Sequence, residues 1–353
     1  MDASASTIAP QLLDWYDRHA REFPWRSAPG VPPPDPYRVW LSEVMLQQTT
    51  TAAVIPYFEE FTRRWPDVSA LAAAEDAEVM AAWAGLGYYA RARNLLACAR
   101  EVAERGGTFP KTEAGLRDLP GLGVYTAAAV AAIAFGEPAV VVDANVERVV
   151  SRLFAISDPL PGSRPRLREA ATKLTPDARA GDFAQAMMDL GATICTSRAP
   201  KCLLCPIAEN CAARSGGDLD RYPAKQPRKQ KPVRQGQAFW IERNGAVWLV
   251  RRPGKGMLGG MRALPDDGWS AKGDGTGVAP LSGAWIRAGV VNHTFTHFAL
   301  ELHLSVYSGD ELSKLDESDG VWWPLQEIED AGLPTLFAKA AHRAIAMVGE
   351  VLE

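Results

Sequence analysis

The stretch LPGLGVYTAAAVAAIAFGEPAVVVDANVERV, residues 119–149, decides how the rest of the chain is interpreted. It opens on Gly121 and Gly123, which permit a sharp turn and a close approach of the backbone to another surface. A run of alanine and valine follows and favours a helix, whose unpaired N–H groups would open at this turn. Three valines then lead to Asp143, which is placed to cap a second helix. The stretch therefore predicts an anion-binding hairpin and, one helix later, a carboxylate at a helix start.

The composition is that of a soluble globular protein. The 353 residues are enough for two or three domains, and hydrophobic residues make up 47% of them. No apolar run is long enough to cross a bilayer, and MDASASTIAPQLLDWY lacks the basic and apolar blocks of a secretory signal, so we expect a cytoplasmic protein. The net charge of −4 does not exclude DNA as a partner, because DNA binding needs a local positive surface rather than a positive total.

Four of the five cysteines lie between residues 195 and 211, with the spacing C-x6-C-x2-C-x5-C. Such a group argues against a disulfide framework and for a metal site in a reducing compartment. The spacing matches neither the usual zinc pairs nor the ferredoxin patterns, so the residues alone leave zinc and an iron–sulfur centre open. The ligands would be Cys195, Cys202, Cys205 and Cys211.

A helix is expected over residues 36–49, PYRVWLSEVMLQQT, and it is apolar on most sides. We therefore expect it to be buried, with Glu43 inside it. Burial without a charged partner raises the pKa of a carboxyl group and favours its protonated form, which a general acid needs. The alternative, for an isolated glutamate, is a solvated residue on an amphipathic helix.

The segments LPGLGVYTA, VDANVERV and WLSEVMLQQT together resemble the helix-hairpin-helix DNA glycosylases related to endonuclease III, in particular the adenine DNA glycosylase (MutY) branch. The resemblance implies a mostly α N-terminal glycosylase with two helical subdomains and a cleft between them. It implies that Glu43 protonates an extruded adenine and that Asp143 stabilises the resulting sugar cation. Tyr125 would orient the acid or the sugar. The implied reaction hydrolyses the N-glycosidic bond of adenine mispaired with 8-oxoguanine or guanine, without cutting the strand.

The resemblance also assigns DNA and base contacts. Gln47 and Gln48 would wedge into the base stack, and Tyr88, in the second Gly-x-Gly turn GLGYYARAR, would intercalate. For that turn, a packed loop with solvated arginines is the alternative. The other N-terminal positions implied to contact DNA or substrate are Trp25, Arg26, Gly121, Gly123, Asn145 and Gln185. The cysteine loop is implied to hold a structural 4Fe–4S cluster.

The composition changes after residue 220. RYPAKQPRKQKPVR is basic, contains three prolines and predicts an extended linker over residues 221–236. Alternating apolar residues around Asn244-Gly245 then predict a β-hairpin. Residues 237–353 resemble the α/β Nudix-like domain of the same branch but lack the glutamate run of a Nudix hydrolase, so we expect binding without hydrolysis. The resemblance implies that Phe295, Thr296 and His297 recognise 8-oxoguanine, with threonine where serine is usual.

The predicted organisation is a glycosylase domain over residues 1–220, the linker, and a lesion-recognition domain over residues 237–353. Its partner would be double-stranded DNA containing A:8-oxoguanine or A:G mispairs. We expect no membrane contact, a monomer, and nucleoid association through DNA. Two alternatives stay open. An endonuclease III-like bifunctional glycosylase/lyase for oxidised pyrimidines needs an amine nucleophile and carries a lysine at the hairpin position of Tyr125. The second alternative is a non-enzymatic iron–sulfur DNA-binding protein, which would need neither the Glu43 nor the Asp143 carboxylate.

Overall fold

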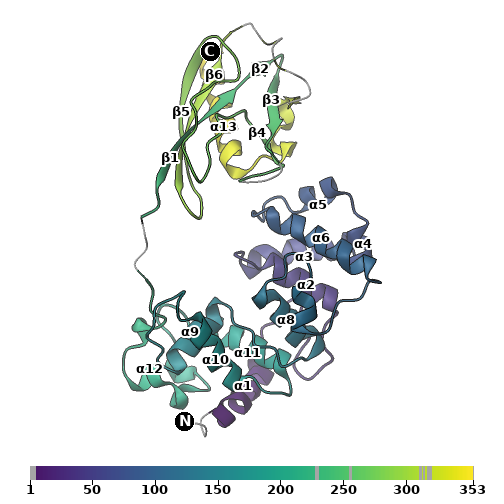
Figure 1. The fold of residues 1–353 in the computed structure, drawn as a ribbon, viewed down its shortest axis with the longest axis vertical. Helices are drawn as coiled ribbons and strands as arrows, with labels where there is room; N and C mark the ends of the chain where they lie inside the picture. Colours follow the sequence, from purple (N-terminus) through teal and green to yellow (C-terminus); the bar gives the residue numbers. More distant parts are fainter. Residues whose placement is uncertain are drawn as a thin grey trace. The chain divides into compact units, whose positions relative to one another are not determined.

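The computed structural model describes residues 5–226, 230–253, 257–309, 312, 315 and 320–352. The chain forms two compact units, Met1–Pro227 and Arg228–Glu353 (Figure 1). The first unit is helical, and the named strands all belong to the second. The expected fold class, a helical N-terminal part followed by a part with sheets, is confirmed. Residues 227–229, in the middle of the predicted linker, lie outside the described residues.

The first unit consists of α-helices joined by short turns. In chain order they are α1 (Ala5–His19), α2 (Pro36–Met45), α3 (Thr51–Arg64), α4 (Val68–Ala72), α5 (Asp76–Ala82), α6 (Ala90–Glu104), α7 (Glu113–Arg117), α8 (Val124–Phe135), α9 (Ala144–Leu153), α10 (Arg164–Leu174), α11 (Ala180–Thr193) and α12 (Ala212–Ser215). Among the described helices, none combines the length and apolar character needed to span a membrane.

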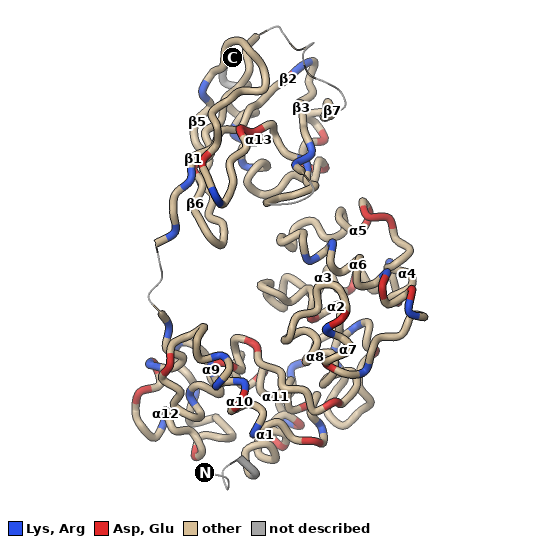
Figure 2. Tube along the Cα trace, in the orientation of Figure 1, with Lys and Arg blue, Asp and Glu red and all other residues tan. Residues whose placement is uncertain are grey.

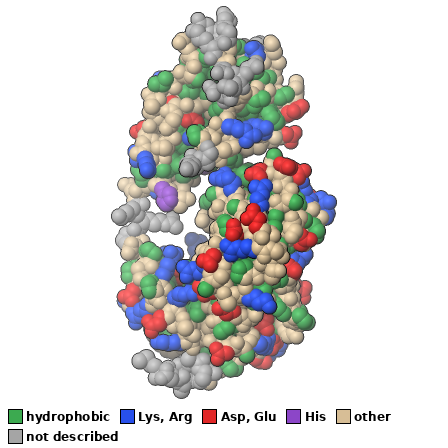
Figure 3. All heavy atoms as spheres, turned by 45° about the vertical axis from the view of Figure 1, so that its right-hand side comes forward, with side chains coloured by type: hydrophobic (Ala, Val, Ile, Leu, Met, Phe, Trp, Pro, Cys, Tyr) green, Lys and Arg blue, Asp and Glu red, His purple; other side chains and the backbone are tan. Residues whose placement is uncertain are grey.

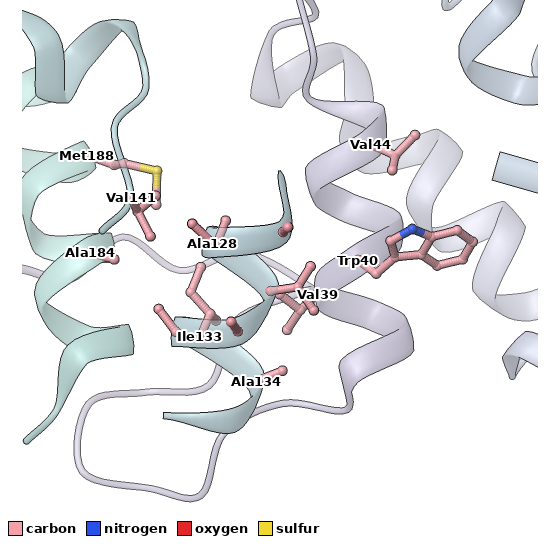
Figure 4. Packing of buried hydrophobic residues seen from close by; sticks show 14 of the residues in the cluster. Val39, Trp40, Val44, Ala128, Ile133, Ala134, Val141, Ala184 and Met188 are labelled. Carbon is pink, nitrogen blue, oxygen red and sulfur yellow. The ribbon is translucent and has the colours of Figure 1, made fainter. Parts of the chain in front are cut away.

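Helix α8 is the centre of this unit because it is apolar on every side. Its residues from Thr126 to Ala134 are all buried, and it packs against α2 on one side and α11 on the other (Figure 4). Gly181 allows the close approach of α11, since a Cβ at that position would lie 2.5 Å from the carbonyl oxygen of Ala132. The alanine-rich sequence of α8 thus brings two other helices near the hairpin at its N-terminus.

The predicted helix over residues 36–49 ends earlier than expected. Helix α2 starts after Asp35, whose side chain accepts a hydrogen bond from the Tyr37 N–H (2.8 Å), and it ends at Met45. Gln47, Gln48 and Thr49 form a turn instead of a further helical turn. Gln48 has a φ of 59°, which is incompatible with a continuing α-helix. The three polar residues therefore stand on a turn at the end of the buried helix.

The second unit contains two sheets and a closing helix. In one sheet, β6 (Ala299–Tyr307) lies between β1 (Val233–Trp240), which is parallel to it, and β5 (Trp285–Thr294), which is antiparallel. In the other, β3 (Ala246–Arg251) pairs with β2 (Glu242–Arg243), β4 (Arg262–Ala263) and β7 (Gly320–Pro324). Helix α13 (Thr335–Leu352) packs against the first sheet. The predicted turn at Asn244-Gly245 is present, with φ values of 51° and 71° that suit a two-residue hairpin.

Charges of both signs are mixed along the chain, as the tube in Figure 2 shows. On the face of the first unit that Figure 3 presents, Lys and Arg side chains are interspersed with Asp and Glu. This distribution agrees with the small net charge of −4. Contacts with a polyanion would accordingly depend on particular turns and helix ends rather than on a uniformly basic face.

Candidate active site

Glu43 lies inside α2 and is only 6% exposed. The helix is buried along most of its length, and its apolar residues Val39, Leu41 and Met45 are among the buried ones. Burial raises the pKa of Glu43 to about 7. A hydrogen bond from Tyr125 and the charge of Arg26 oppose this shift, whereas the charge of Asp143 adds to it. The expectation of a buried glutamate with a raised pKa is therefore met in the structure.

Tyr125 stands in the first turn of α8 and reaches α2. Its hydroxyl donates a hydrogen bond to Oε2 of Glu43 (2.8 Å) and also contacts Sδ of Met188 on α11 (3.6 Å). Burial, together with the nearby carboxyl groups of Glu43 and Asp143, raises the pKa of Tyr125 well above its ordinary value. The phenol therefore stays protonated and acts as a donor toward the glutamate.

Asp143 caps helix α9, as the sequence predicted. Its Oδ1 accepts a hydrogen bond from the Val146 N–H (2.7 Å), and its Oδ2 accepts one from Nδ2 of Asn145 (2.9 Å). Burial raises the pKa of Asp143, while these donors and the charge of Arg148 act in the opposite direction. Asp143 accepts from three N–H groups, those of the Val146 backbone, the Asn145 side chain and the Asn145 backbone, whereas the donor to Glu43 is the Tyr125 hydroxyl. The two environments favour different roles for the two carboxyl groups.

The hairpin before α8 has the conformation that its glycines suggested. Gly121 has a φ of 76°, and a Cβ there would lie 2.7 Å from Cβ of Asn94. Gly123 caps the start of α8, and both glycines are exposed. The unpaired N–H groups of the first helical turn therefore open at an accessible turn, which is the arrangement that binds an anion such as a phosphate.

Two further turns expose the residues that the sequence assigned to the base stack. Gln48 and Tyr88 are exposed, and Tyr88 has a φ of 46°. Gln47 is half-buried and donates from Nε2 to Oγ1 of Thr126 (3.1 Å), beside the catalytic candidate Tyr125. Asn145 is half-buried next to Asp143. Of these four residues, Gln48 and Tyr88 are the exposed ones.

Two residues predicted to contact DNA or substrate, Trp25 and Arg26, have buried side chains. Trp25 is 5% exposed because it stacks on Phe23 (5.0 Å between ring centroids) and meets the edge of Phe58 (5.2 Å). Arg26 has a 9% exposed side chain and forms an ion pair with Asp189 (2.8 Å). Arg26 also acts on the site through its charge, which lowers the pKa of Glu43. Direct contact of either side chain with DNA or substrate stays a prediction.

Gln185 is also buried, at 6% exposure, and its Nε2 donates to the carbonyl of Gly181 one turn back along α11 (3.3 Å). Helix α11 carries Met188, which contacts Tyr125, so Gln185 belongs to the helix that borders the site. The structure shows no contact between Gln185 and the two carboxyl groups within the described residues. Its assignment to the base pocket stays a prediction.

The four clustered cysteines lie on the turns that follow α11. Burial is the main cause that raises the pKa of Cys205 to about 11, and the charges of the other three thiols act in the same direction. Among the residues that the structure describes, no three His, Cys, Asp or Glu side chains converge closely enough to hold a metal ion. Thiols are the donor type that both zinc and iron–sulfur centres use, and an N–H of Arg152 donates to Sγ of Cys195 (3.4 Å). Cys98 is separate from this group and buried in the core.

Several arginines near the site were not identified from the sequence. Arg148 donates to the carbonyl of Cys195 (2.7 Å), to the carbonyl of Gly191 (2.6 Å) and to Oδ1 of Asn145 (2.9 Å). Its spacing of three residues from Asn145 on a helix is the one signal that could have suggested this contact. Arg91, whose guanidinium is buried, offers no such signal because its partners are distant in sequence.

In the second unit, Phe295, Thr296 and His297 lie at the tip between β5 and β6. Thr296 and His297 are exposed, but Phe295 is half-buried and stacks on Phe298 (4.8 Å between ring centroids). The Phe295 N–H donates to the carbonyl of Phe298 (2.8 Å), which closes the tip. The Thr296 hydroxyl and the His297 imidazole are therefore the accessible groups of this loop, while the Phe295 ring packs against Phe298.

Comparisons with known proteins identify both parts of the chain. Residues 41–176 match the HhH-GPD superfamily base excision DNA repair proteins, and residues 237–343 match the NUDIX domain. The fold resembles a thermostable thymine-DNA glycosylase, with a TM-score of 0.55 and 31% identity over 61% of this chain and 98% of that chain. A non-covalent endonuclease III–DNA complex has a similar fold, with a TM-score of 0.51 and 22% identity over 62% of this chain and 98% of that chain.

Curated relatives named adenine DNA glycosylase cover most of the chain. The protein of Homo sapiens is 36% identical over 84% of this chain and 66% of its own length. The protein of Rattus norvegicus is 34% identical over 96% and 78%, and that of Mycolicibacterium smegmatis is 44% identical over 60% and 71%. This chain spans only 46% of the Arabidopsis thaliana relative and 61% of the Mus musculus relative. By sequence, the chain belongs to the adenine DNA glycosylase family of HhH-GPD superfamily base excision DNA repair proteins.

Proposed function

We propose that this protein is a DNA glycosylase that removes adenine mispaired with 8-oxoguanine or guanine by hydrolysing its N-glycosidic bond. The observation that carries the proposal is the buried pair of Glu43 and Tyr125, 2.8 Å apart, in which the glutamate has a pKa of about 7. A carboxyl group with this pKa is partly protonated at neutral pH and can act as a general acid. Family membership supports adenine as the base.

The reaction needs the adenine outside the helix. Extrusion costs a few kcal/mol, and a mispair lowers that cost. Glu43 then donates its proton to a ring nitrogen of the base, which becomes a neutral leaving group as the C–N bond breaks. The sugar is left as a cation, and the carboxylate of Asp143, held by the Val146 N–H and by Asn145, stabilises it electrostatically. Water adds to the sugar and releases a proton, so the products are free adenine and an abasic site.

Cys195, Cys202, Cys205 and Cys211 would hold a 4Fe–4S cluster. When bound, the cluster would supply iron–thiolate bonds that stiffen the loop. Arg152 supports this loop from α9 by donating to Sγ of Cys195 (3.4 Å) and to the carbonyl of Thr196 (2.7 Å). No step of the proposed hydrolysis requires electron transfer. The second unit, residues 237–353, would recognise the lesion opposite the adenine, and the protein would act on duplex DNA as a monomer in the cytoplasm.

The bifunctional alternative is less well supported because Schiff-base chemistry needs an amine. The hairpin position implied for the lyase lysine holds Tyr125, a phenol whose pKa is well above its ordinary value and which donates to Glu43. A phenol in this state is neither an amine nor a good nucleophile. The structural likeness to a thymine-DNA glycosylase makes thymine a base to test beside adenine.

The proposal can be tested on matched duplexes containing A:8-oxoguanine, A:G, T:G or an oxidised pyrimidine. We expect excision of adenine from the first two, with the strand cut only after treatment with alkali. Borohydride should trap little covalent protein–DNA adduct. Preferential removal of thymine or of the oxidised pyrimidine, or abundant borohydride trapping, would contradict the proposal. A protein that binds these duplexes but excises no base would support the non-enzymatic alternative.

A further inference from the structure

Arg91, in the first turn of α6, joins elements that are far apart in sequence. Its side chain is 9% exposed, and its guanidinium contacts the end of α2. Nη1 donates to the carbonyl of Val44 (3.1 Å) and to the carbonyl of Met45 (2.8 Å). Carbonyl groups in the last turn of a helix have no partner within the helix, so these bonds both satisfy and fix the end of α2.

The other arm of the same guanidinium contacts two turns. Nη2 donates to Oγ1 of Thr49 (3.1 Å), on the turn after α2, and to the carbonyl of Leu86 (2.8 Å), on the Gly-x-Gly turn before α6. The Gly87 carbonyl lies at 3.5 Å. The guanidinium carbon also lies 5.5 Å from the ring centroid of Tyr88. The Arg91 side chain therefore connects the turn after α2 and the turn before α6 to the end of α2.

Each of these turns carries an exposed residue in a strained conformation. Gln48 has a φ of 59° and Tyr88 a φ of 46°, although neither is glycine. Left-handed conformations of this kind cost on the order of 1–3 kcal/mol and persist only where the surroundings determine them. Arg91 bonds to Met45 and Thr49, on either side of Gln48, and its backbone N–H donates to the Tyr88 carbonyl (2.7 Å).

The hairpin before α8 adjoins the same side chain. A small cavity is lined by Arg91, Gln47 and Asn94 on one side and by residues 120–122 of the hairpin on the other. Nε of Arg91 is buried without a hydrogen-bond partner among the described residues. Arg91 thus contacts two of the turns and shares a cavity with the hairpin, yet its guanidinium is buried.

We propose that Arg91 is a positioning residue that presents Gln48 and Tyr88 together to the DNA base stack and so drives base extrusion. It acts through hydrogen bonds to backbone carbonyls and to the Thr49 hydroxyl, and not through contact with DNA. The inference rests on the proposed function, because extrusion is the step that these side chains would serve. Lysine cannot replace arginine here, since one ammonium group lacks the planar fork that reaches carbonyls in two directions.

Arg91→Lys tests the proposal because it keeps the positive charge. Its single-turnover excision of adenine from an A:8-oxoguanine duplex should fall about tenfold relative to the unaltered protein. On a duplex in which the adenine faces an abasic site, extrusion is less costly, and the rate should stay within about twofold. The matched control is Arg100→Lys, the same change on the same helix at an exposed arginine paired with Asp76. It should leave both rates unchanged.

Base extrusion can also be measured without excision. In a Glu43→Gln background, 2-aminopurine beside the target adenine should brighten when the protein binds, and Arg91→Lys should reduce this rise at saturating protein. Thr49→Val removes a single contact of Arg91 at a half-buried position and should reduce it by a smaller amount. Circular dichroism at the assay temperature verifies that each variant is folded.

The outcomes separate the two proposals. Equal loss of rate on both duplexes, or full 2-aminopurine brightening in Arg91→Lys, would show that Arg91 only stabilises the fold. If Arg91→Lys does not fold, unchanged brightening in Thr49→Val overturns the inference. If the unaltered protein excises no adenine, the proposed function fails, while the dependence of brightening on Arg91 and Thr49 still decides the present inference.

Discussion

The hydroxyl of Tyr125 lies 2.8 Å from Oε2 of Glu43 and joins the first turn of α8 to the middle of α2. This bond links α8, which begins at the Gly-x-Gly hairpin, to the carboxyl group proposed as the acid. It also lowers the pKa of Glu43 against the larger effect of burial, and the balance is a pKa of about 7. The same contact therefore affects both the position and the protonation of the glutamate.

Glu43→Gln should abolish adenine excision and leave binding to the mispaired duplex intact. Glutamine keeps the shape of the side chain and can still accept the bond from Tyr125, but it has no proton to give. Loss of general acid catalysis is typically worth 10²–10⁴-fold in rate, so we expect a decrease of at least about 10²-fold. Single-turnover kinetics and equilibrium binding measure the two quantities. Excision at nearly the original rate would remove Glu43 from the mechanism.

The same substitution should stabilise the protein at alkaline pH. The pKa of Glu43 is raised from 4.5 to about 7, so the folded state holds this proton more tightly than the unfolded state does. Its contribution to stability is fully present below pH 4.5 and is lost as the pH rises through about 7. At pH 8 the neutral amide should relieve a cost on the order of 3 kcal/mol. Denaturant unfolding at pH 8 and at pH 5 should show a gain that is much larger at pH 8.

Tyr125→Phe should shift the pH dependence of excision toward higher pH. The phenol favours the charged form of Glu43, so its removal raises the pKa of the glutamate further. The acid form then persists to higher pH, although its less constrained side chain should lower the maximal rate. A series of single-turnover rates from about one unit below to about two units above the present pKa of about 7 measures the midpoint. A midpoint that stays in place or moves down would show that this bond does not set the protonation of Glu43.

The helical fold and the polar centre of the site could be predicted because their signals are local. The alanine run of α8, the Gly-x-Gly turn before it and Asp143 before α9 each act within a few residues of their own position. Glu43 could be predicted as buried because its immediate neighbours are apolar. The hairpin at Asn244-Gly245 is local in the same sense.

What the sequence could not provide are contacts between distant segments. Arg26 pairs with Asp189, which lies on α11, far along the chain. Trp25 packs against Phe58, which is likewise distant in sequence, and this contact shows that Trp25 is in the core. Arg91 looked like one of several arginines in a basic turn, whereas its acceptors are mainly backbone carbonyls, which no side-chain pattern reveals.

The cysteine loop should contain iron and sulfide. Four thiols, together with the hydrogen bond from Arg152 to Cys195, suit a cluster, and thiolate-to-iron charge transfer should make the protein brown. Elemental analysis of protein purified without oxygen measures the metal. Arg152→Gln should lower the iron content, since it removes both the bond to the sulfur and the support of the loop through Thr196. Zinc without iron in the unaltered protein would contradict this assignment.

The loop between β5 and β6 should distinguish 8-oxoguanine from guanine through two exposed side chains. 8-Oxoguanine has a carbonyl at C8 and an N–H at N7, so the Thr296 hydroxyl and the His297 imidazole can each respond to the change, at about 1–3 kcal/mol for a well-made contact. Thr296→Ala and His297→Ala should lower the rate and affinity ratio of A:8-oxoguanine over A:G. Basal excision from A:G should persist, because Glu43, Tyr125 and Asp143 belong to the first unit.

Thr296→Ser, which keeps the hydroxyl, is the matched control and should retain the ratio. Phe295→Ala is a poorer test, since the ring stacks on Phe298 and its loss would disturb the loop. An unchanged ratio in both alanine variants would place lesion recognition outside this loop.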